Sequence, residues 1–152
     1  MTDESFMAEA LRLAQEAQTH DEVPVGAILV IENQIVGRGA NSPIARNDPT
    51  AHAEILALRE AAASIGNYRL ENSTLYCTLE PCVMCAGALV TARVARLVFG
   101  TRDLRFGGVR SKFRLADSDL LNHRIEIAEG ILATECVELL QRFFETRRNV
   151  LY

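Results

Sequence analysis

Short β-rich segments alternate with helical patterns along most of the chain, and this alternation restricts the fold more than any other feature. Residues 23–31 and 34–39 predict a hairpin, residues 74–79 and 95–100 two further strands, and residues 125–128 an edge strand. Strands separated by helices of about ten to fifteen residues favour βαβ units, in which helices cover a sheet of parallel strands. The pattern therefore predicts an α/β fold with a largely parallel sheet.

The helices are predicted from apolar residues that recur every three or four positions. The first ends near His20, and the second begins at the capping signal Asp48-Pro49-Thr50 and ends at Gly66. A third helix follows Glu80-Pro81 and covers residues 82–91. The last is indicated by an apolar face that comprises Leu132, Cys136, Leu139, Leu140 and Phe143.

Length and composition suit one domain. The chain has 152 residues, of which 49% are apolar and 24% charged, as is ordinary for a globular protein. It contains no repeat or linker, so we expect residues 1–152 to form a single domain. The longest apolar run, residues 23–31, is too short to span a membrane, and residues 1–6 are acidic and polar, unlike a secretory signal. We therefore expect a cytoplasmic protein that does not enter a membrane.

Two short motifs carry the candidate chemistry. His52-Ala53-Glu54 lies near the start of the second predicted helix, and Pro81-Cys82-Val83-Met84-Cys85 lies at the start of the third. Zn²⁺ prefers four tetrahedral nitrogen and sulfur ligands, and a catalytic site keeps one position for water. Cysteines three positions apart can reach one ion from one helical turn, and a helix N-terminus favours thiolates. His52, Cys82 and Cys85 are therefore the predicted ligands of one Zn²⁺.

Glu54 is the predicted catalytic acid and base. It lies two positions from His52, a spacing that does not align side chains on an ideal helix, so it suits a place beside the zinc-activated water better than that of a fourth ligand. Zinc lowers the pKa of its bound water to about 7. In the deamination of a nucleobase, Glu54 is expected to take the proton of this water and deliver it to a nitrogen of the base ring and to the amine that leaves. Together the motifs match the H-x-E…P-C-x-x-C signature of zinc deaminases of nucleobases.

Each motif, taken alone, is compatible with a different role. A single C-x-x-C can be a redox pair or half of a structural zinc site. A closed zinc site of three cysteines and one histidine is a further alternative; it would use Cys77 and would leave Glu54 without a role. Without an export signal, a disulfide framework is not expected. Cys77 and Cys136 lie among apolar residues and are expected in the core, whereas His20 and His123 fall in polar segments and are expected to be exposed.

Charge is unevenly distributed along the chain. The net charge is −4, but residues 1–90 carry −7 and residues 91–152 carry +3. The stretch from Arg102 to Arg114 holds five cations and one anion. A local cluster of this kind can attract phosphates even on an acidic protein.

The sequence around both motifs resembles the bacterial tRNA-specific adenosine deaminases, which convert the wobble adenosine of an anticodon to inosine. The resemblance spans nearly the whole chain. It is carried by residues 23–27, 47–54 and 78–88, by Asn122-His123-Arg124, and by Phe143-Phe144 with Arg147-Arg148. It implies a three-layer α/β/α sandwich with a mixed five-stranded sheet, and a homodimer whose partner subunit helps to form the groove for the tRNA anticodon stem-loop.

The resemblance also implies residues that hold the target base. Asn41 would hydrogen-bond the purine, while Val25 and Gly26 would line its pocket, with Gly26 allowing close approach of the base. From the residues alone, Asn41 is equally typical of a turn, and Gly26 could mark a bulge in a strand.

Further residues are implied to contact the RNA. Arg102 and Asp103 would lie beside the anticodon nucleotides, and Phe144, Arg147 and Arg148 would reach the RNA from the last helix. The adjacent Phe143 belongs to the apolar face, and arginines near a helix C-terminus also interact favourably with the helix dipole. The segment Leu104-Arg105-Phe106 departs from the family, which usually has a proline or alanine followed by lysine at its first two positions.

The predicted function is hydrolytic deamination of adenosine to inosine at the wobble position of a tRNA anticodon. One alternative is a deaminase of a free base or nucleotide, such as cytosine or guanine, which would share the zinc motifs without needing a basic segment. A second is a non-catalytic binding module stabilised by zinc, which would need a fourth protein ligand.

Overall fold

The computed structural model describes residues 1–150, with side chains as far as Arg147. The side chain of Arg148, one of the expected RNA contacts, therefore lies outside the described residues. The five strands are β1 (Gly26–Ile31), β2 (Gln34–Ala40), β3 (Ser73–Leu79), β4 (Arg96–Thr101) and β5 (Glu126–Glu129). The helices are α1 (Asp3–Thr19), α2 (Pro43–Arg46), α3 (Ala53–Ile65), α4 (Val83–Thr91) and α5 (Ala133–Val150).

The strands form one mixed sheet in the order β2-β1-β3-β4-β5. β1 is antiparallel to both of its neighbours, whereas β3, β4 and β5 are mutually parallel. The mixed five-stranded sheet and the hairpin are confirmed, whereas the expectation of a largely parallel sheet is wrong at β1, which is antiparallel to β3 as well as to its hairpin partner β2. There the chain reverses through Glu32 and Asn33, both at positive φ, and α3 then leads from β2 to the far side of β1. A crossover that skips one strand cannot be recognised from the alternation alone.

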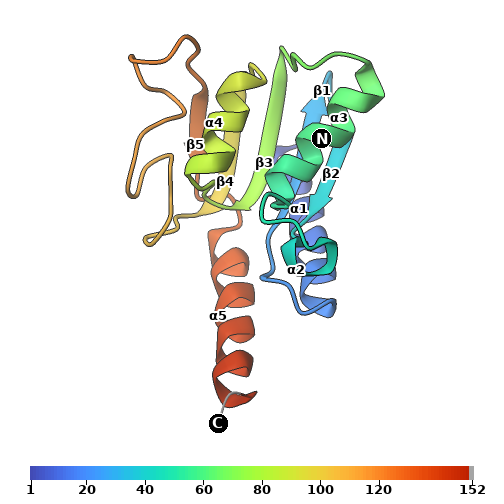
Figure 1. Ribbon diagram of the computed structural model, residues 1–152, viewed down its shortest axis with the longest axis vertical. Helices are drawn as coiled ribbons and strands as arrows, with labels where there is room; N and C mark the ends of the chain where they lie inside the picture. The colour runs from blue at the N-terminus through green and yellow to red at the C-terminus, as the bar shows by residue number, and fades with distance from the viewer. Residues whose placement is uncertain (151–152) are drawn as a thin grey trace.

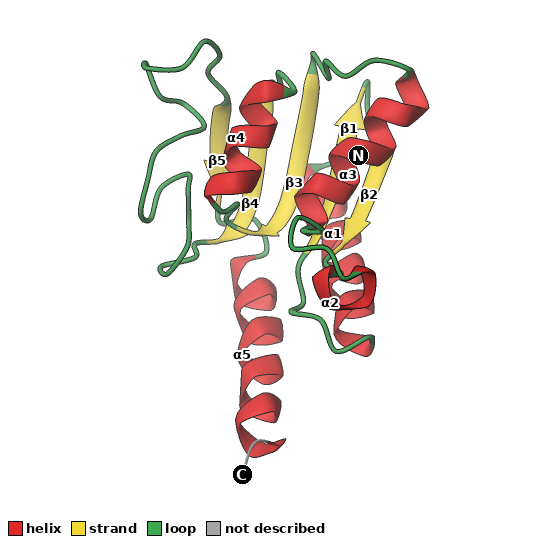
Figure 2. Ribbon diagram, in the orientation of Figure 1, coloured by secondary structure: helices red, strands yellow, loops and turns green. Residues whose placement is uncertain are grey.

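Helices cover both faces of the sheet, which confirms the three-layer sandwich. In Figures 1 and 2, α3 and α4 lie in front of the strands and α1 lies behind them. Successive strand residues point to opposite faces. One face packs against α3 and α4 and includes Ala27, Leu29, Leu75, Cys77, Leu97 and Phe99. The other packs against α1 and includes Ile28, Val30, Tyr76 and Val98.

The first turns of the last helix pack against α1. Cys136 and Leu139 of α5 pack against Leu11 and Ala14 of α1. The rest of the helix extends past the ends of the strands, on the side where α2 lies (Figure 1). Both core cysteines, Cys77 and Cys136, are buried, as the sequence predicted. No helix within residues 1–150 combines the length and hydrophobicity that crossing a membrane requires.

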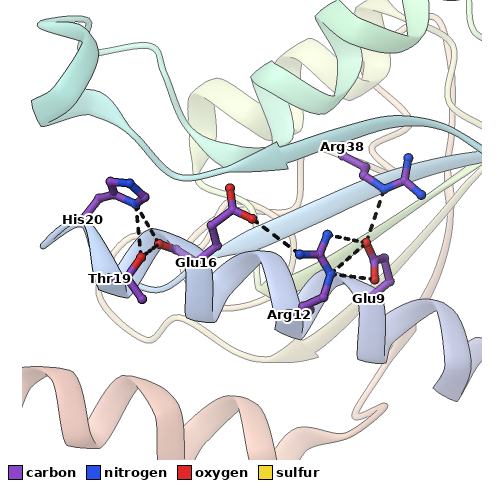
Figure 3. A network of polar contacts seen from close by, with 6 residues as sticks. All are labelled: Glu9, Arg12, Glu16, Thr19, His20 and Arg38. Carbon is purple, nitrogen blue, oxygen red and sulfur yellow. Dashed lines mark hydrogen bonds and ion pairs between the residues drawn. The ribbon is translucent and has the colours of Figure 1, made fainter.

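Polar contacts join α1 to the edge strand β2. The Glu9 carboxylate accepts hydrogen bonds from Arg12 on its own helix and from Arg38 on β2, at 2.7 and 3.3 Å (Figure 3). His20, at the end of α1, is exposed as predicted, and its ring lies 3.0 Å from the Glu16 carbonyl. His123 was wrongly expected to be fully exposed: it is half-buried, and its Nε2 atom lies 2.7 Å from the Val94 carbonyl.

The second predicted helix begins later than expected. The Asp48 side chain caps a turn instead, because it accepts hydrogen bonds from the backbone N–H and the hydroxyl of Thr50 at 2.9 and 2.7 Å. The helix α3 begins at Ala53, with His52 as its extended N-cap residue at φ −73° and ψ 152°. The short helix α2 was not predicted. The later start leaves His52 outside the helix, where its side chain can turn toward α4.

Candidate metal centre and active-site cavity

Three potential metal ligands meet at the N-termini of two helices. His52 is the N-cap of α3, Cys82 is the N-cap of α4, and Cys85 lies in the first turn of α4. The Nδ1 atom of His52 lies 3.6 Å from Sγ of Cys82 and 3.5 Å from Sγ of Cys85. All three ligand atoms are within 4.8 Å of one another. The site therefore lies beyond the C-terminal end of β3, where ligands commonly bind in α/β sheets.

These distances fit one Zn²⁺. With Zn–N near 2.05 Å and Zn–S near 2.3 Å in a tetrahedron, the nitrogen and sulfur atoms should be about 3.6 Å apart. Cys77 is not part of this group, which is the one cluster of at least three suitable ligands among the described residues. The three protein ligands that the sequence predicted are thus brought together, and a closed site using Cys77 gains no support.

The ligands polarise one another. A hydrogen bond from Cys85 lowers the pKa of Cys82 to about 4 against the opposing effect of burial, and a bond from His52 adds to this. The same contact with Cys82 raises the pKa of Cys85 above its usual range, and the pKa of His52 is raised as well. Zn²⁺ binds thiolates and neutral imidazole, so its binding would displace the protons that these contacts favour on Cys85 and His52.

Glu54 lies beside these ligands in the first turn of α3. Its side chain is buried, with only 4% of the residue exposed, and it lines the same cavity as His52 and Cys82. Burial raises the pKa of Glu54, and the negative charge on Cys82 raises it further. A carboxyl group with a raised pKa holds a proton more readily, which suits a group that must both accept and return one.

Two of the three metal ligands, His52 and Cys82, border a cavity of about 800 Å³. Its walls come from the segment before β1, the loop after β2, the N-termini of α3 and α4, the segment after β4, and α5. The predicted site residues that line it are Val25, Asn41, His52, Glu54, Cys82, Arg102, Asp103 and Phe144. Cys85, Gly26 and Arg147 are not among the lining residues.

The proposed base contacts differ in their surroundings. Asn41 is 8% exposed, and its amide nitrogen donates to the Val23 carbonyl at 3.2 Å, which fixes the side chain at the cavity. Gly26 is needed for packing against α1. A Cβ atom there would come within 2.0 Å of the Ala10 carbonyl oxygen, so the close approach that this glycine permits is that of α1.

Glu80 organises the segment after β4, a role that the sequence did not reveal. Its carboxylate is 2% exposed and accepts hydrogen bonds from the backbone N–H groups of Asp103, Val109, Arg110 and Ser111, at 2.7–3.1 Å, and from the Ser111 hydroxyl. Burial raises the pKa of Glu80, but these hydrogen bonds outweigh it and leave the pKa lowered. Residues 103–111, which we call the anchored segment, are thereby fixed to the residue that precedes Pro81 and Cys82.

The anchored segment also contacts the metal-binding motif directly. Cys82 and Gly107 form an isolated antiparallel bridge, and Gly108 donates to the Pro81 carbonyl at 2.8 Å. A Cβ atom on Gly107 would come within 2.4 Å of the Glu80 carboxyl carbon, so only glycine allows this approach. The sequence showed Glu80 only as part of a helix start, because its partners lie 23–31 positions away.

The charged residues proposed to contact RNA already have partners. Arg102 forms a two-pronged ion pair with Glu129 on β5, at 2.8 and 3.1 Å. The Asp103 carboxylate accepts hydrogen bonds from the backbone N–H groups of Arg105 and Phe106 at 3.0 and 3.1 Å. Arg102 remains about half exposed, so it can still meet a phosphate.

On α5 the two phenylalanines separate as predicted. Phe143 is 6% exposed and Phe144 is 41% exposed. The Arg147 guanidinium lies 4.8 Å from the centre of the Phe143 ring and also contacts the backbone carbonyl and the carboxylate of Asp21. Arg147 therefore joins α5 to the turn after α1.

Comparison with known proteins agrees with this geometry. A family model described as the cytidine and deoxycytidylate deaminase zinc-binding region matches residues 1–101. The tRNA-specific adenosine deaminase of Haemophilus influenzae is 52% identical over 148 residues, which cover 97% of this chain and 86% of the relative. The protein of the same name from Buchnera aphidicola is 46% identical, with 96% of each chain covered.

Solved structures give the same result. A tRNA:A34 deaminase, from work on A-to-I editing at the wobble position of transfer RNA, superposes with a TM-score of 0.87 at 40% identity, covering 90% of this chain and 99% of that one. A guanine deaminase from Nitrosomonas europaea superposes with a TM-score of 0.80 at 26% identity, covering 92% and 83%. With a zinc-deaminase sequence signature, a matching ligand cluster and these relatives, the chain belongs to the cytidine and deoxycytidylate deaminase family, among the tRNA-specific adenosine deaminases.

Proposed function

We propose that the protein deaminates adenosine to inosine at the wobble position of a tRNA anticodon. One observation carries the proposal: His52, Cys82 and the buried Glu54 border a cavity that is also lined by Arg102 and by residues 103–106 of the anchored segment. The relatives named for this activity support the same substrate. The overall reaction adds water at carbon 6 of the purine and releases ammonia.

The chain's own residues would divide the chemistry as follows. When bound to His52, Cys82 and Cys85, Zn²⁺ supplies a water that ionises near neutral pH. Glu54 takes a proton from the attacking water, delivers one to the ring nitrogen, and assists departure of the amine as ammonia. Only 4% of Glu54 is exposed, which limits its contact with bulk water that would compete for these protons.

Other residues would hold the base and the RNA. We assign Asn41 to a hydrogen bond with the purine and Val25 to apolar contact with its ring, because both line the cavity beside Glu54. Gly26 packs tightly against α1, so it would line the base pocket only with its backbone. On the RNA side we assign Arg102, Asp103 and Phe144, which line the cavity, and Arg147 and Arg148 near the end of α5.

A free-base deaminase is the second candidate, favoured by the structural similarity to a guanine deaminase. The test is to incubate the zinc-loaded protein with an anticodon stem-loop that carries adenosine at the wobble position, and separately with guanine, cytosine and adenosine. We expect inosine in the RNA, with an equal amount of ammonia. A matched stem-loop that carries guanosine at that position should release none. Ammonia from a free base, without inosine in the RNA, would refute the proposal.

We further propose a homodimer. Large apolar side chains are exposed on two helices near the site: Ile44 on α2 is 67% exposed, and Val83 and Met84 at the start of α4 are 46% and 37% exposed. Burial of such groups stabilises subunit contacts. Sedimentation equilibrium should give twice the chain mass for the wild type and a smaller mass for Met84→Glu. A monomeric wild type at micromolar concentration would contradict this.

A cytoplasmic location is also proposed. The metal site needs Cys82 and Cys85 in the reduced state rather than joined in a disulfide, and a reducing compartment maintains that state. Cell fractionation with an antibody should find the protein with cytosolic markers.

A further inference from the structure

An exposed aromatic ring lies at the rim of the active-site cavity. Phe106 is 62% exposed, lines the cavity, and follows β4 in the anchored segment. Phe144 on α5 and Leu104 line the same cavity and are also exposed. Large apolar groups that remain in solvent around a site, rather than singly on the surface, indicate a surface that binds something.

The ring is held in place by the backbone beneath it. The Asp103 carboxylate accepts the N–H groups of Arg105 and Phe106, and the N–H of Gly107 donates to the Asp103 carbonyl at 2.9 Å. Glu80 fixes both ends of the same segment. A ligand that meets Phe106 therefore does not have to order a loop first, which preserves affinity.

A positive charge accompanies the ring. The Arg105 guanidinium carbon lies 5.3 Å from the centre of the Phe106 ring, and Arg102 lines the same cavity. Aromatic rings combined with cations are the features by which proteins hold single-stranded nucleic acid: bases stack on the rings and phosphates meet the cations. A cavity of about 800 Å³ also has room for more than the target base.

We propose that Phe106 is a stacking platform for an unpaired base adjacent to the target nucleotide in the substrate RNA. This inference rests on the proposed function. The target base itself belongs deeper, beside Glu54 and Asn41, which are buried, whereas Phe106 lies at the exposed rim. The neighbouring base is thus the part of the RNA that can meet this ring.

The first test compares Phe106→Ala with Phe113→Ala on the stem-loop substrate. Phe113 is a matched control, because it lies in the same loop and is 57% exposed but does not line the cavity. Phe106→Ala should raise KM by about 5- to 150-fold, the loss of one stacked base, with kcat nearly unchanged. Phe106→Tyr should keep the wild-type KM, and so should Phe113→Ala.

The second test removes the base from the RNA instead. Stem-loops with an abasic site at each nucleotide flanking the target are assayed with the wild type and with Phe106→Ala. One abasic site should raise KM for the wild type by the same factor as the substitution, and it should add little to Phe106→Ala. Additive effects at every position would overturn the inference.

Two other outcomes would also overturn it. Equal KM values for Phe106→Ala and Phe113→Ala would do so while leaving the proposed function intact, provided that the wild type still forms inosine. A lower mass of Phe106→Ala in sedimentation equilibrium would assign the ring to a contact between subunits. Failure of the wild type itself to form inosine would instead refute the proposed function.

Discussion

The Nδ1 atom of His52 lies 3.5 Å from the Sγ atom of Cys85, although 33 positions separate the two residues in the sequence. We expect Cys85→Ser to lose the metal, because it removes one of three protein ligands from the cluster. Zinc measured by atomic emission after dialysis should fall from about one ion per chain to near zero. Cys136→Ser, which changes a core cysteine outside the cluster, should retain the ion. Equal zinc contents would contradict the assigned site.

Glu54→Gln should separate metal binding from proton transfer. The amide is close to the carboxyl in size but cannot carry protons, so kcat should fall by about 10²- to 10⁴-fold while the zinc content stays at the wild-type level. Glu60→Gln, which alters an exposed carboxylate on the same helix, should keep full activity. A fully active Glu54→Gln would show that the mechanism is wrong.

Arg102→Ala tests the proposed phosphate contact. The logarithm of the RNA dissociation constant is plotted against the logarithm of salt concentration, and each phosphate contact with a single strand contributes about 0.7 to the slope. The slope should therefore become shallower by about 0.7, with weaker binding at low salt. Arg12→Ala removes a similarly exposed, ion-paired arginine on α1, and the slope should not change. A wild-type slope near zero would favour a small-molecule substrate.

Asp3 should make stability depend on pH. The hydrogen bonds from Arg96 and then Tyr76 lower the pKa of this carboxyl from 3.8 to about 2. Ionised Asp3 therefore stabilises the folded state fully above the unfolded-state pKa of about 4. This stabilisation is lost as the pH falls through about 2. After solvent screening the effect should be about 1–2 kcal/mol.

Urea unfolding between pH 6 and pH 2 measures this loss. Asp3→Asn should be less stable at pH 6, and its stability should fall less between pH 4 and pH 2 than that of the wild type. Since we propose that residues 1–152 form one domain, each curve should show a single transition. Parallel pH profiles for the two proteins would rule out the contribution of Asp3.

Glu80→Gln should loosen the anchored segment. The amide offers one acceptor oxygen where the carboxylate offers two, so some of the N–H donors are left without a partner, at a cost of about 1–3 kcal/mol. Hydrogen exchange should accelerate at the amides of Val109, Arg110 and Ser111. Ser111→Ala removes one of the hydrogen bonds and should cause a smaller change in the same direction. Unchanged exchange in Glu80→Gln would mean that the carboxylate does not hold the segment.

The zinc ligands could be predicted from sequence because local rules govern them. Two cysteines three positions apart at a helix start, and a histidine at another helix start, are recognisable without knowing how the helices pack. The start of α3 was harder to predict, because the Asp48 side chain caps a turn and not the helix. The sequence pattern is the same whether an aspartate caps a turn or a helix.

Relationships between distant segments could not be predicted in the same way. The close packing of α1 on Gly26 depends on which elements meet in space, and so does the attachment of residues 103–111 to Glu80. The resemblance to a family supplied the mixed sheet that alternation alone did not. The substrate contacts assigned to Asn41 and Phe144 stay predictions until RNA binding is measured.

The donors that hold the anchored segment to Glu80 are, with the exception of the Ser111 hydroxyl, main-chain groups. The path of this segment is therefore largely indifferent to the identity of the side chains that it displays at positions 104–106. A lineage, or an engineer, could exchange those side chains to alter which RNA context is preferred, without rebuilding the metal-binding motif that the segment contacts. Recognition and chemistry can in this way diversify at separate rates within one small enzyme.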